Sequence, residues 1–290
     1  MDDQTETTQQ ENIQSGPLPA IKKPENNEDN LKADNTALAK EQNDLGKALK
    51  SQGKIPEATI AFLKAVKFDS KNLDFLNDLI SIFRAQKKYQ ELIALDKARI
   101  NLEPDNPDAY FDLGEDLRHC HRIEEAILCY NLVTKINPDH QQVYPLLGVT
   151  CLSVGRCEEA LAAFQKAAEF DPENPLSYNN IGAALANLNR KEEAIVAYQT
   201  AVKVQPLLFS LRPLGRLLQE TGRSAEAIPV LEKVVELHAE DSESWFLLGR
   251  ALGEEGRSEE SKAALLKSIQ LKFTDPGQLA AALEQFKDLL

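Results

Sequence analysis

The sequence predicts an all-α fold, a solenoid in which similar pairs of antiparallel helices stack along the chain. The first observation is a repeat: between residues 143 and 206, Gly148 and Phe164 recur as Gly182 and Tyr198, each 34 residues later. A fixed period of this length is typical of stacked repeat architectures. The second observation is that each half of the repeat places its large apolar residues on one stripe of a helix. The third is a glycine or asparagine between the halves, since these residues tolerate the left-handed conformation at a helix end.

The first segment of the chain, residues 1–37, is predicted to be a disordered acidic tail. It contains no aromatic residue, and it is interrupted by Gly16, Pro17, Pro19 and Pro24. So polar a segment cannot bury enough apolar surface to offset the entropy of ordering its backbone. Its role stays open between a solubilising tail and a short docking or autoinhibitory segment.

Residues 38–274 are predicted to form seven repeat units of two helices each. The units span residues 39–72, 73–106, 107–140, 141–174, 175–207, 208–241 and 242–274. A small residue marks the place in each first helix where the second helix passes close. These residues are Gly46, Gly114, Gly148, Gly182, Gly215 and Gly249, with Ile80 in the second unit.

Each second helix has a small residue near its start, and several second helices are followed by proline, which cannot continue a helix. The small residues are Ala58, Ala126, Ala160, Ala194, Ala227 and Ser261, with Leu92 in the second unit. The prolines are Pro104, Pro138, Pro172 and Pro206. Because Ile80, Leu92, Asp96 and Arg99 all depart from the pattern, we expect the second unit to pack differently from the others.

The turn between the two helices is flanked by charged residues that recur in all seven units. A basic residue follows the turn, and a glutamate stands three residues later, as in Arg190 and Glu193. We expect the cation to lie at the negative end of the first helix and the glutamate at the positive end of the second. This pattern indicates matching of charges at helix ends rather than a binding site.

Residues 275–290 are predicted to form a capping helix. Asp275 stands at the N-cap position and Pro276 at the first helical position, which proline favours. One apolar stripe then contains Leu279, Leu283, Phe286 and Leu290. Such a helix would cover the open side that the last repeat of a stack otherwise exposes.

The charge of the chain excludes several classes of protein. Lys and Arg total 33 against 46 Asp and Glu, a formal net charge of −13, whereas a nucleic-acid-binding protein usually has a basic surface. The same charge disfavours anionic membrane surfaces, and no apolar run is long enough to span a bilayer. The acidic start does not resemble a signal peptide, and the four Cys are sparse and contain no CxxC pair. We therefore expect a cytoplasmic protein.

We expect no catalytic set, cofactor or metal. His119, Cys120 and His121 are adjacent, but neighbouring residues on a helix point in different directions and do not converge on one ion. Cys151 falls on the apolar stripe of its repeat, which indicates an inert buried thiol rather than a nucleophile. The sequence contains neither a P-loop nor a GxGxxG motif.

The repeat resembles the tetratricopeptide repeat (TPR). The last unit carries the first-helix pattern of that family in Trp245, Leu248, Gly249 and Leu252, and the middle units have Tyr144 or Tyr178 in the place of the tryptophan. The resemblance implies a right-handed superhelix of antiparallel helix pairs. It also implies that the first helices line a concave groove, which binds peptides or partner domains.

The resemblance implies that residues beside the packing stripe of the first helices face the groove. The predicted groove runs from acidic, through apolar and amide, to basic, which suits an extended peptide of mixed charge. Its predicted partner-binding residues are Asp78, Asp112, Glu115, Leu146, Val149, Asn179, Asn180, Asn187, Arg212, Arg216, Phe246 and Arg250, and Asp116 is expected beside them.

We therefore interpret the chain as a non-enzymatic adaptor or scaffold that binds a peptide or partner protein in its groove. Two alternatives stay open. In the first, the chain is a substrate-recognition subunit of an enzyme complex, since its middle repeats resemble the TPR arms of protein O-GlcNAc transferases. In the second, it is a scaffold that self-assembles into a homo-oligomer.

Overall fold

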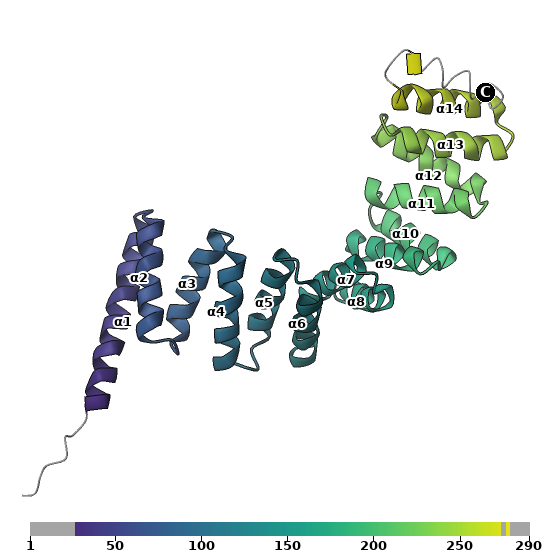
Figure 1. The fold of residues 1–290 in the computed structure, drawn as a ribbon. Helices are drawn as coiled ribbons and strands as arrows, with labels where there is room; N and C mark the ends of the chain where they lie inside the picture. The colour runs from purple at the N-terminus through teal and green to yellow at the C-terminus, as the bar shows by residue number, and fades with distance from the viewer. Residues whose placement is uncertain (1–26, 274–276, 279–290) are drawn as a thin grey trace, which may run out of the picture. The chain divides into compact units, whose positions relative to one another are not determined.

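The computed structural model describes residues 27–273 and 277–278. It confirms the all-α fold: the described residues form fourteen helices in successive pairs, with no strand among them (Figure 1). The chain divides into two compact units, Met1–Ile82 and Phe83–Leu290, which we call unit 1 and unit 2. The boundary between them falls inside one helix, α3 (Leu73–Ala85).

Unit 1 contains the first helix pair, α1 (Asn27–Ser51) and α2 (Ile55–Phe68), and most of α3. Helices α1 and α2 pack along each other, and buried Ala39, Ala65 and Phe75 form a small core. Helices α1 and α2 pack on each other in the same way as the helix pairs of unit 2.

The start of α1 corrects one prediction. The tail was expected to extend to residue 37, but α1 begins at Asn27. All four predicted breakers, from Gly16 to Pro24, precede this residue, and residues 27–37 contain neither glycine nor proline. Adding a residue to an existing helix is far less costly than starting one, so the packed part of α1 extends toward the N-terminus.

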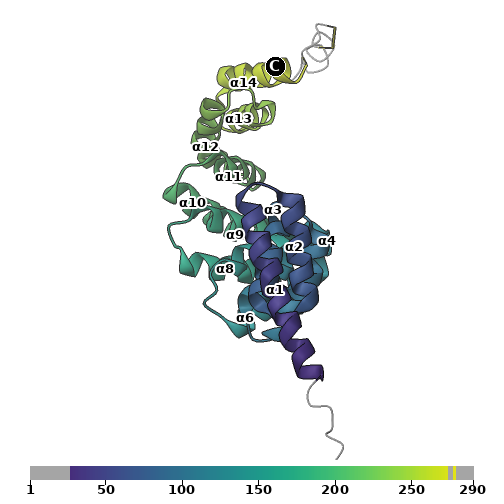
Figure 2. The ribbon, with the colours of Figure 1, turned by 90° about the vertical axis from the view of Figure 1, so that its left-hand side faces the viewer.

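Unit 2 contains the end of α3 and eleven further helices, which alternate between first and second helices of the repeats. Neighbouring helices pack on each other along the chain, as the stack from α12 to α14 shows in Figure 2. One continuous hydrophobic core runs from Ile93 to Ala264. The helices are α4 (Tyr89–Leu102), α5 (Pro107–His119), α6 (Ile123–Ile136), α7 (Val143–Ser153), α8 (Cys157–Phe170), α9 (Pro175–Asn187), α10 (Lys191–Val204), α11 (Leu208–Glu220), α12 (Ser224–Leu237), α13 (Ser242–Glu254) and α14 (Ser258–Lys272).

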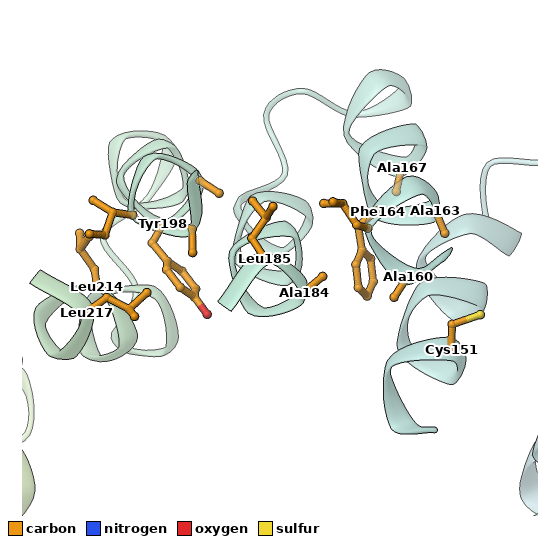
Figure 3. Packing of buried hydrophobic residues seen from close by; sticks show 14 of the residues in the cluster. Cys151, Ala160, Ala163, Phe164, Ala167, Ala184, Leu185, Tyr198, Leu214 and Leu217 are labelled. Carbon is orange, nitrogen blue, oxygen red and sulfur yellow. The ribbon is translucent and has the colours of Figure 1, made fainter. Parts of the chain in front are cut away.

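The glycines of the first helices make room for a large side chain of the second helix. A Cβ atom added to Gly182 would lie 2.8 Å from Cε1 of Tyr198, and one added to Gly148 would lie closer still to the Phe164 ring. Figure 3 shows Phe164 and Tyr198 inside this packing. The same arrangement joins Gly46 to Phe62, Gly114 to Tyr130, Gly215 to Leu231 and Gly249 to Leu265. The close approach of the two helices is confirmed, and its reason is an aromatic or leucine side chain that faces each glycine.

The ends of the helices follow the predicted signals. Helices α4, α6, α8 and α10 each end two residues before the proline that was expected to stop them. The turn residues Gly53, Gly155, Gly222, Gly256 and Asn189 all have positive φ, as expected for residues that end a first helix. The predicted capping helix, 275–290, lies outside the described residues except for Gly277 and Gln278.

Two turns place ordinary side chains in the same left-handed conformation. Lys87 has φ 56° and His121 has φ 59°, at the positions that glycine or asparagine occupies in the other repeats. This conformation brings the Cβ atom of an L-residue close to the following carbonyl oxygen. The run His119-Cys120-His121 is therefore the end of a helix and a strained turn.

We expect His121→Gly to raise the free energy of unfolding by about 0.5–1 kcal/mol, because the relieved strain exceeds the entropy cost of glycine. The reverse change, Gly155→Ala, should lower it by a similar amount through the backbone alone, since no atom lies within 4 Å of the added Cβ. Urea unfolding followed by circular dichroism measures both. A destabilised His121→Gly variant would contradict the prediction.

The charged residues that flank the turns form direct ion pairs, which extends the predicted helix-end matching. In five repeats the arginine after the turn donates two hydrogen bonds to the glutamate three residues later, as Arg190 does to Glu193 at 2.7 Å through each nitrogen. These bonds lower the pKa of Glu193 below its usual value. Some of the arginines also reach the preceding repeat, and Arg156 lies 3.0 Å from Glu124. The pairs are exposed, so they set local geometry rather than a ligand site.

Candidate functional site

The first helices of unit 2, namely α5, α7, α9, α11 and α13, form a surface that we call the first-helix face. Successive first helices contact each other directly in the pairs α7/α9 and α11/α13. All the predicted partner-binding residues except Asp78 belong to these helices. Val149 and Phe246 are large apolar side chains that stay 48% and 45% exposed on this face, whereas Leu146 is half-buried.

The acidic side chains at the start of the predicted groove are held by cations of the same chain. In unit 1, Asp78 accepts a hydrogen bond from Nδ2 of Asn43 at 2.9 Å and lies 3.1 Å from Nζ of Lys47. In unit 2, Oδ2 of Asp112 accepts a hydrogen bond from Nη2 of Arg99 at 2.6 Å. These carboxylates already have partners inside the fold.

The other two acids of this group differ in exposure. Asp116 was expected beside the groove, but it is 3% exposed, because its place on α5 faces the core. Glu115 is partly exposed and lies 4.0 Å from Arg118. Of the three α5 acids that were expected at the groove, Glu115 alone has a partly exposed side chain and no ion pair closer than 4.0 Å.

The three asparagines of α9 have different partners. Oδ1 of Asn179 accepts a long hydrogen bond, 3.4 Å, from Oγ of buried Ser210 on α11. Nδ2 of Asn187 donates to the carbonyl of Ala183 in its own helix at 2.8 Å. Asn180 is half-buried, and its amide has no hydrogen-bond partner in the part of the chain that the structure describes. Asn180 is therefore the asparagine best placed to bind a backbone from outside.

The arginines at the basic end of the predicted groove are each paired with a carboxylate. Arg212 lies 2.8 Å from Asp241, and Arg250 lies 3.6 Å from Glu254. Arg216 donates a short hydrogen bond to Glu243. The expected excess of positive charge is thus neutralised locally. The acids lie at the two ends of α13, and the position of an arginine on one helix does not show which acids lie beside it.

Asn187, Arg212 and Arg216 meet at one pocket, which we call the α9–α11 pocket. Its volume is about 400 Å³. Apolar side chains and three cations share its lining, and Figure 3 shows two of the apolar residues, Tyr198 and Leu217. The residues that line it are Ala186, Asn187, Lys191, Tyr198, Arg212, Pro213, Arg216, Leu217 and Glu220.

Six of the nine lining residues were not predicted, among them Lys191, Pro213 and Glu220. Lys191 on α10 and Glu220 on α11 form an ion pair at 2.9 Å that joins two repeats. Pro213 lies inside α11 and has no N–H, so the carbonyl of Phe209 lacks its usual α-helical donor. Pro213 stands at the same repeat position as Asp112, Leu146 and Asn180, two residues before the recurring glycine. A proline at this position was the signal in the sequence that could have indicated the free carbonyl.

A larger pocket lies among α12, α13 and α14, with a volume of about 620 Å³ and Trp245 in its lining. A smaller pocket among α6, α7 and α8 has the corresponding residues, with Tyr144 in the place of Trp245. Both aromatic residues donate to a backbone carbonyl, Trp245 to Ala239 at 2.8 Å and Tyr144 to Pro138 at 2.6 Å. Since these pockets recur at equivalent positions, they follow from the packing of the repeats.

The thiols of the core are poorly suited to nucleophilic chemistry. Cys151 is buried, as predicted, and burial raises the pKa of Cys129 and Cys151 to about 11. Within residues 27–273 and 277–278, no group of three or more His, Cys, Asp or Glu side chains is arranged to hold a metal ion. Among the described helices, none has the length and apolar character that a membrane span requires.

Solved structures show the same fold in other proteins. YrrB, described as a TPR protein with an unusual peptide-binding site, is 19% identical with a TM-score of 0.56, covering 65% of this chain and 97% of YrrB. A tetratricopeptide repeat protein from Parabacteroides merdae is 16% identical with a TM-score of 0.54, covering 86% and 98%. MamA from Desulfovibrio magneticus is 20% identical with a TM-score of 0.54, covering 58% and 96%.

Family models agree with this fold. One model described as TPR repeat matches residues 150–189, and two described as tetratricopeptide repeat match residues 176–206 and 212–276. None of the curated proteins matches the chain. The matched segments, the fourteen helices in successive pairs and the shared fold lead to one conclusion: residues 150–206 and 212–276 contain tetratricopeptide repeats, and the fourteen helices fit about seven such repeats.

Proposed function

We propose that this TPR protein is a non-enzymatic adaptor that binds an extended peptide segment of a partner protein on the first-helix face. The observation that carries this proposal is the α9–α11 pocket, whose lining combines Asn187, Arg212 and Arg216 with apolar side chains. The peptide-binding site described for YrrB supports a peptide as the kind of occupant that this fold accepts.

The chemistry of the surrounding residues favours an extended chain. An extended peptide has unpaired N–H and C=O groups. The amide of Asn180 offers it a donor and an acceptor, and the Phe209 carbonyl offers a further acceptor. The exposed side chains of Val149 and Phe246 provide apolar contacts on either side of the pocket.

The ion pairs of the pocket favour a partner with acidic side chains among residues of mixed charge. A carboxylate of the partner can replace Glu243 as the acceptor of the Arg216 hydrogen bond, or Asp241 as the ion-pair partner of Arg212, because each exchange replaces one charged contact with another. The released acids then become available to a basic side chain of the same partner. Exchange of this kind contributes more to the specificity of binding and to the association rate than to affinity.

The proposal predicts that Arg212→Ala and Arg216→Ala together weaken peptide binding at least tenfold, which is about 1.4 kcal/mol or more. Peptides are first selected with the wild-type protein from a random 12-residue phage display library, and titration calorimetry then measures their Kd. The matched control is Arg122→Ala, since Arg122 forms a similar exposed ion pair with Glu125 in a repeat that contributes no residue to the pocket. Equal affinity of wild type and double variant, equal weakening by the control, or no selected peptide would each contradict the proposal.

A further inference from the structure

The contact between α4 and α5 in unit 2 contains charged residues where the other repeats have apolar ones. Asp96 stands at the position of the aromatic residues Phe62, Tyr130, Phe164 and Tyr198. Arg99 stands at the position of Ala167, and Asp116 at that of Ala184. Asp96 is 0% exposed and Asp116 is 3% exposed, so a polar cluster replaces part of the hydrophobic core at this one contact.

Arginines hold one side of this cluster. Nη2 of Arg99 lies 2.6 Å from Oδ2 of Asp112 and 3.3 Å from Oδ1 of Asp96. Nη2 of Arg84, at the end of α3 within unit 2, lies 3.3 Å from Oδ2 of Asp112. Both arginines therefore face Asp112, and three carboxyl groups share two guanidinium groups.

The other side of the cluster is a carboxyl–carboxyl contact. Asp96 and Asp116 are within hydrogen-bonding distance of each other. Neither oxygen of Asp96, nor Oδ2 of Asp116, receives a well-aligned hydrogen bond from any N–H or O–H group among the described residues. Two ionised carboxylates have no donor between them and repel each other. Among the described residues, the donor that can satisfy this contact is a proton bound to one of the two carboxyl groups.

The surroundings favour that proton. Burial, followed by the hydrogen bond to Asp116, raises the pKa of Asp96 to about 8, although Arg99 opposes the shift. Burial also raises the pKa of Asp116. The remaining groups that face the pair are Arg84 on α3, Asp112 and Glu115 on α5, and the thiol of Cys129 on α6, which stays protonated.

We propose that a proton shared by Asp96 and Asp116 holds α4 against α5, and that this contact opens increasingly as the pH rises. This pH-dependent contact involves α4 and α5 and does not depend on the α9–α11 pocket. When α4 and α5 separate, water reaches both carboxyl groups and the proton is released.

The direction of the pH dependence follows from the two states. The closed contact binds a proton that the open one loses, so the stability of the contact is complete below the ordinary carboxyl pKa of about 4 and declines as pH rises. The decline ends near pH 8, where Asp96 of the closed contact also ionises. Between these limits the opening constant should rise about tenfold per pH unit, since one proton is released.

Hydrogen exchange with mass spectrometry tests the proposal on the full chain between pH 5.5 and 8.5. Rates for amides of α4 and α5 are divided by their intrinsic rates and compared with amides of α9 and α10 in the same molecule. We expect the relative opening of α4 and α5 to increase about tenfold per pH unit up to pH 7.5 and to level off near pH 8.

Asp96→Asn separates the shared proton from other effects, because its amide N–H can donate to Asp116 at every pH. We expect it to remove the pH dependence while keeping the α-helical circular dichroism spectrum. Asp116→Asn is the mirror variant and serves if Asp96→Asn does not fold. The matched control is Asp105→Asn, at an exposed position of the α4–α5 loop, which should keep the wild-type profile. A flat wild-type profile, or an unchanged dependence in a folded Asp96→Asn or Asp116→Asn variant, would overturn the proposal.

Discussion

Replacing Phe164 by alanine is expected to lower the free energy of unfolding of unit 2 by about 3–5 kcal/mol. The side chain is 1% exposed and lies in the continuous core between α7 and α8. Its removal loses buried apolar area and leaves a cavity beside Gly148, which has no side chain to fill it. Urea unfolding, with hydrogen exchange of α7 and α8 amides, measures the loss.

Gly148→Ala shows whether this glycine exists to admit the Phe164 ring. In a helix interior, alanine is favoured over glycine by about 1 kcal/mol, so propensity alone predicts stabilisation. The clash with the ring predicts the reverse, a loss of about 1–3 kcal/mol. In the Phe164→Ala background the clash is absent, and the same change should be neutral or stabilising.

The exposed side chain of Val196 on α10 provides the control for both variants. It is 61% exposed, so Val196→Ala should change stability by no more than about 0.5 kcal/mol. Two results would contradict this packing of Phe164 against Gly148. One is a loss below about 1 kcal/mol for Phe164→Ala, and the other is a destabilising effect of Gly148→Ala in the Phe164→Ala background.

Arg99→Met is the second change with a large expected effect, a loss of about 3–5 kcal/mol at pH 7. The Arg99 side chain is 11% exposed and pairs with Asp112 and Asp96, whose side chains are 18% and 0% exposed. Methionine preserves much of the volume, but it leaves buried carboxylates without their closest cation. Breaking a buried ion pair from one side costs more than the pair itself contributes.

The double variant Arg99→Met/Asp112→Asn tests this explanation, because it removes the stranded charge together with the cation. We expect it to recover at least half of the loss, measured by urea unfolding. The control is Arg250→Met on α13, since the side chains of Arg250 and Glu254 are 50% and 44% exposed and should contribute less than about 1 kcal/mol. No recovery in the double variant would mean that Arg99 acts through packing rather than charge.

Asp112 shows why part of the candidate site could not be predicted. Its position on the first helix indicated a residue beside the groove, but a position on one helix does not show which side chains reach it from another helix. Arg99 comes from the preceding helix, and its length brings the guanidinium group to Asp112. Arg212 and Arg216 show the same limit, because their partners Asp241 and Glu243 lie at the N-terminal end of another helix, α13.

The pocket itself was only partly predictable. Asn187, Arg212 and Arg216 were chosen as separate residues along a groove, and the structure brings these three to one pocket. Lys191 was missed because only residues of the first helices were expected to face the groove. Its long side chain reaches Glu220 on the neighbouring first helix, and this contact depends on how α10 and α11 pack.

The sequence by itself determined the all-helical repeat, its period and the ends of most helices. Periodicity, proline and left-handed turn residues act over a few residues, so they can be read without knowing what packs against what. The tertiary structure alone decided that Gly148 faces the Phe164 ring, that Asp96 and Asp116 form a buried carboxyl pair, and which cations have acidic partners. Those outcomes depend on distances between side chains of different helices, and neither composition nor spacing along the chain contains these distances.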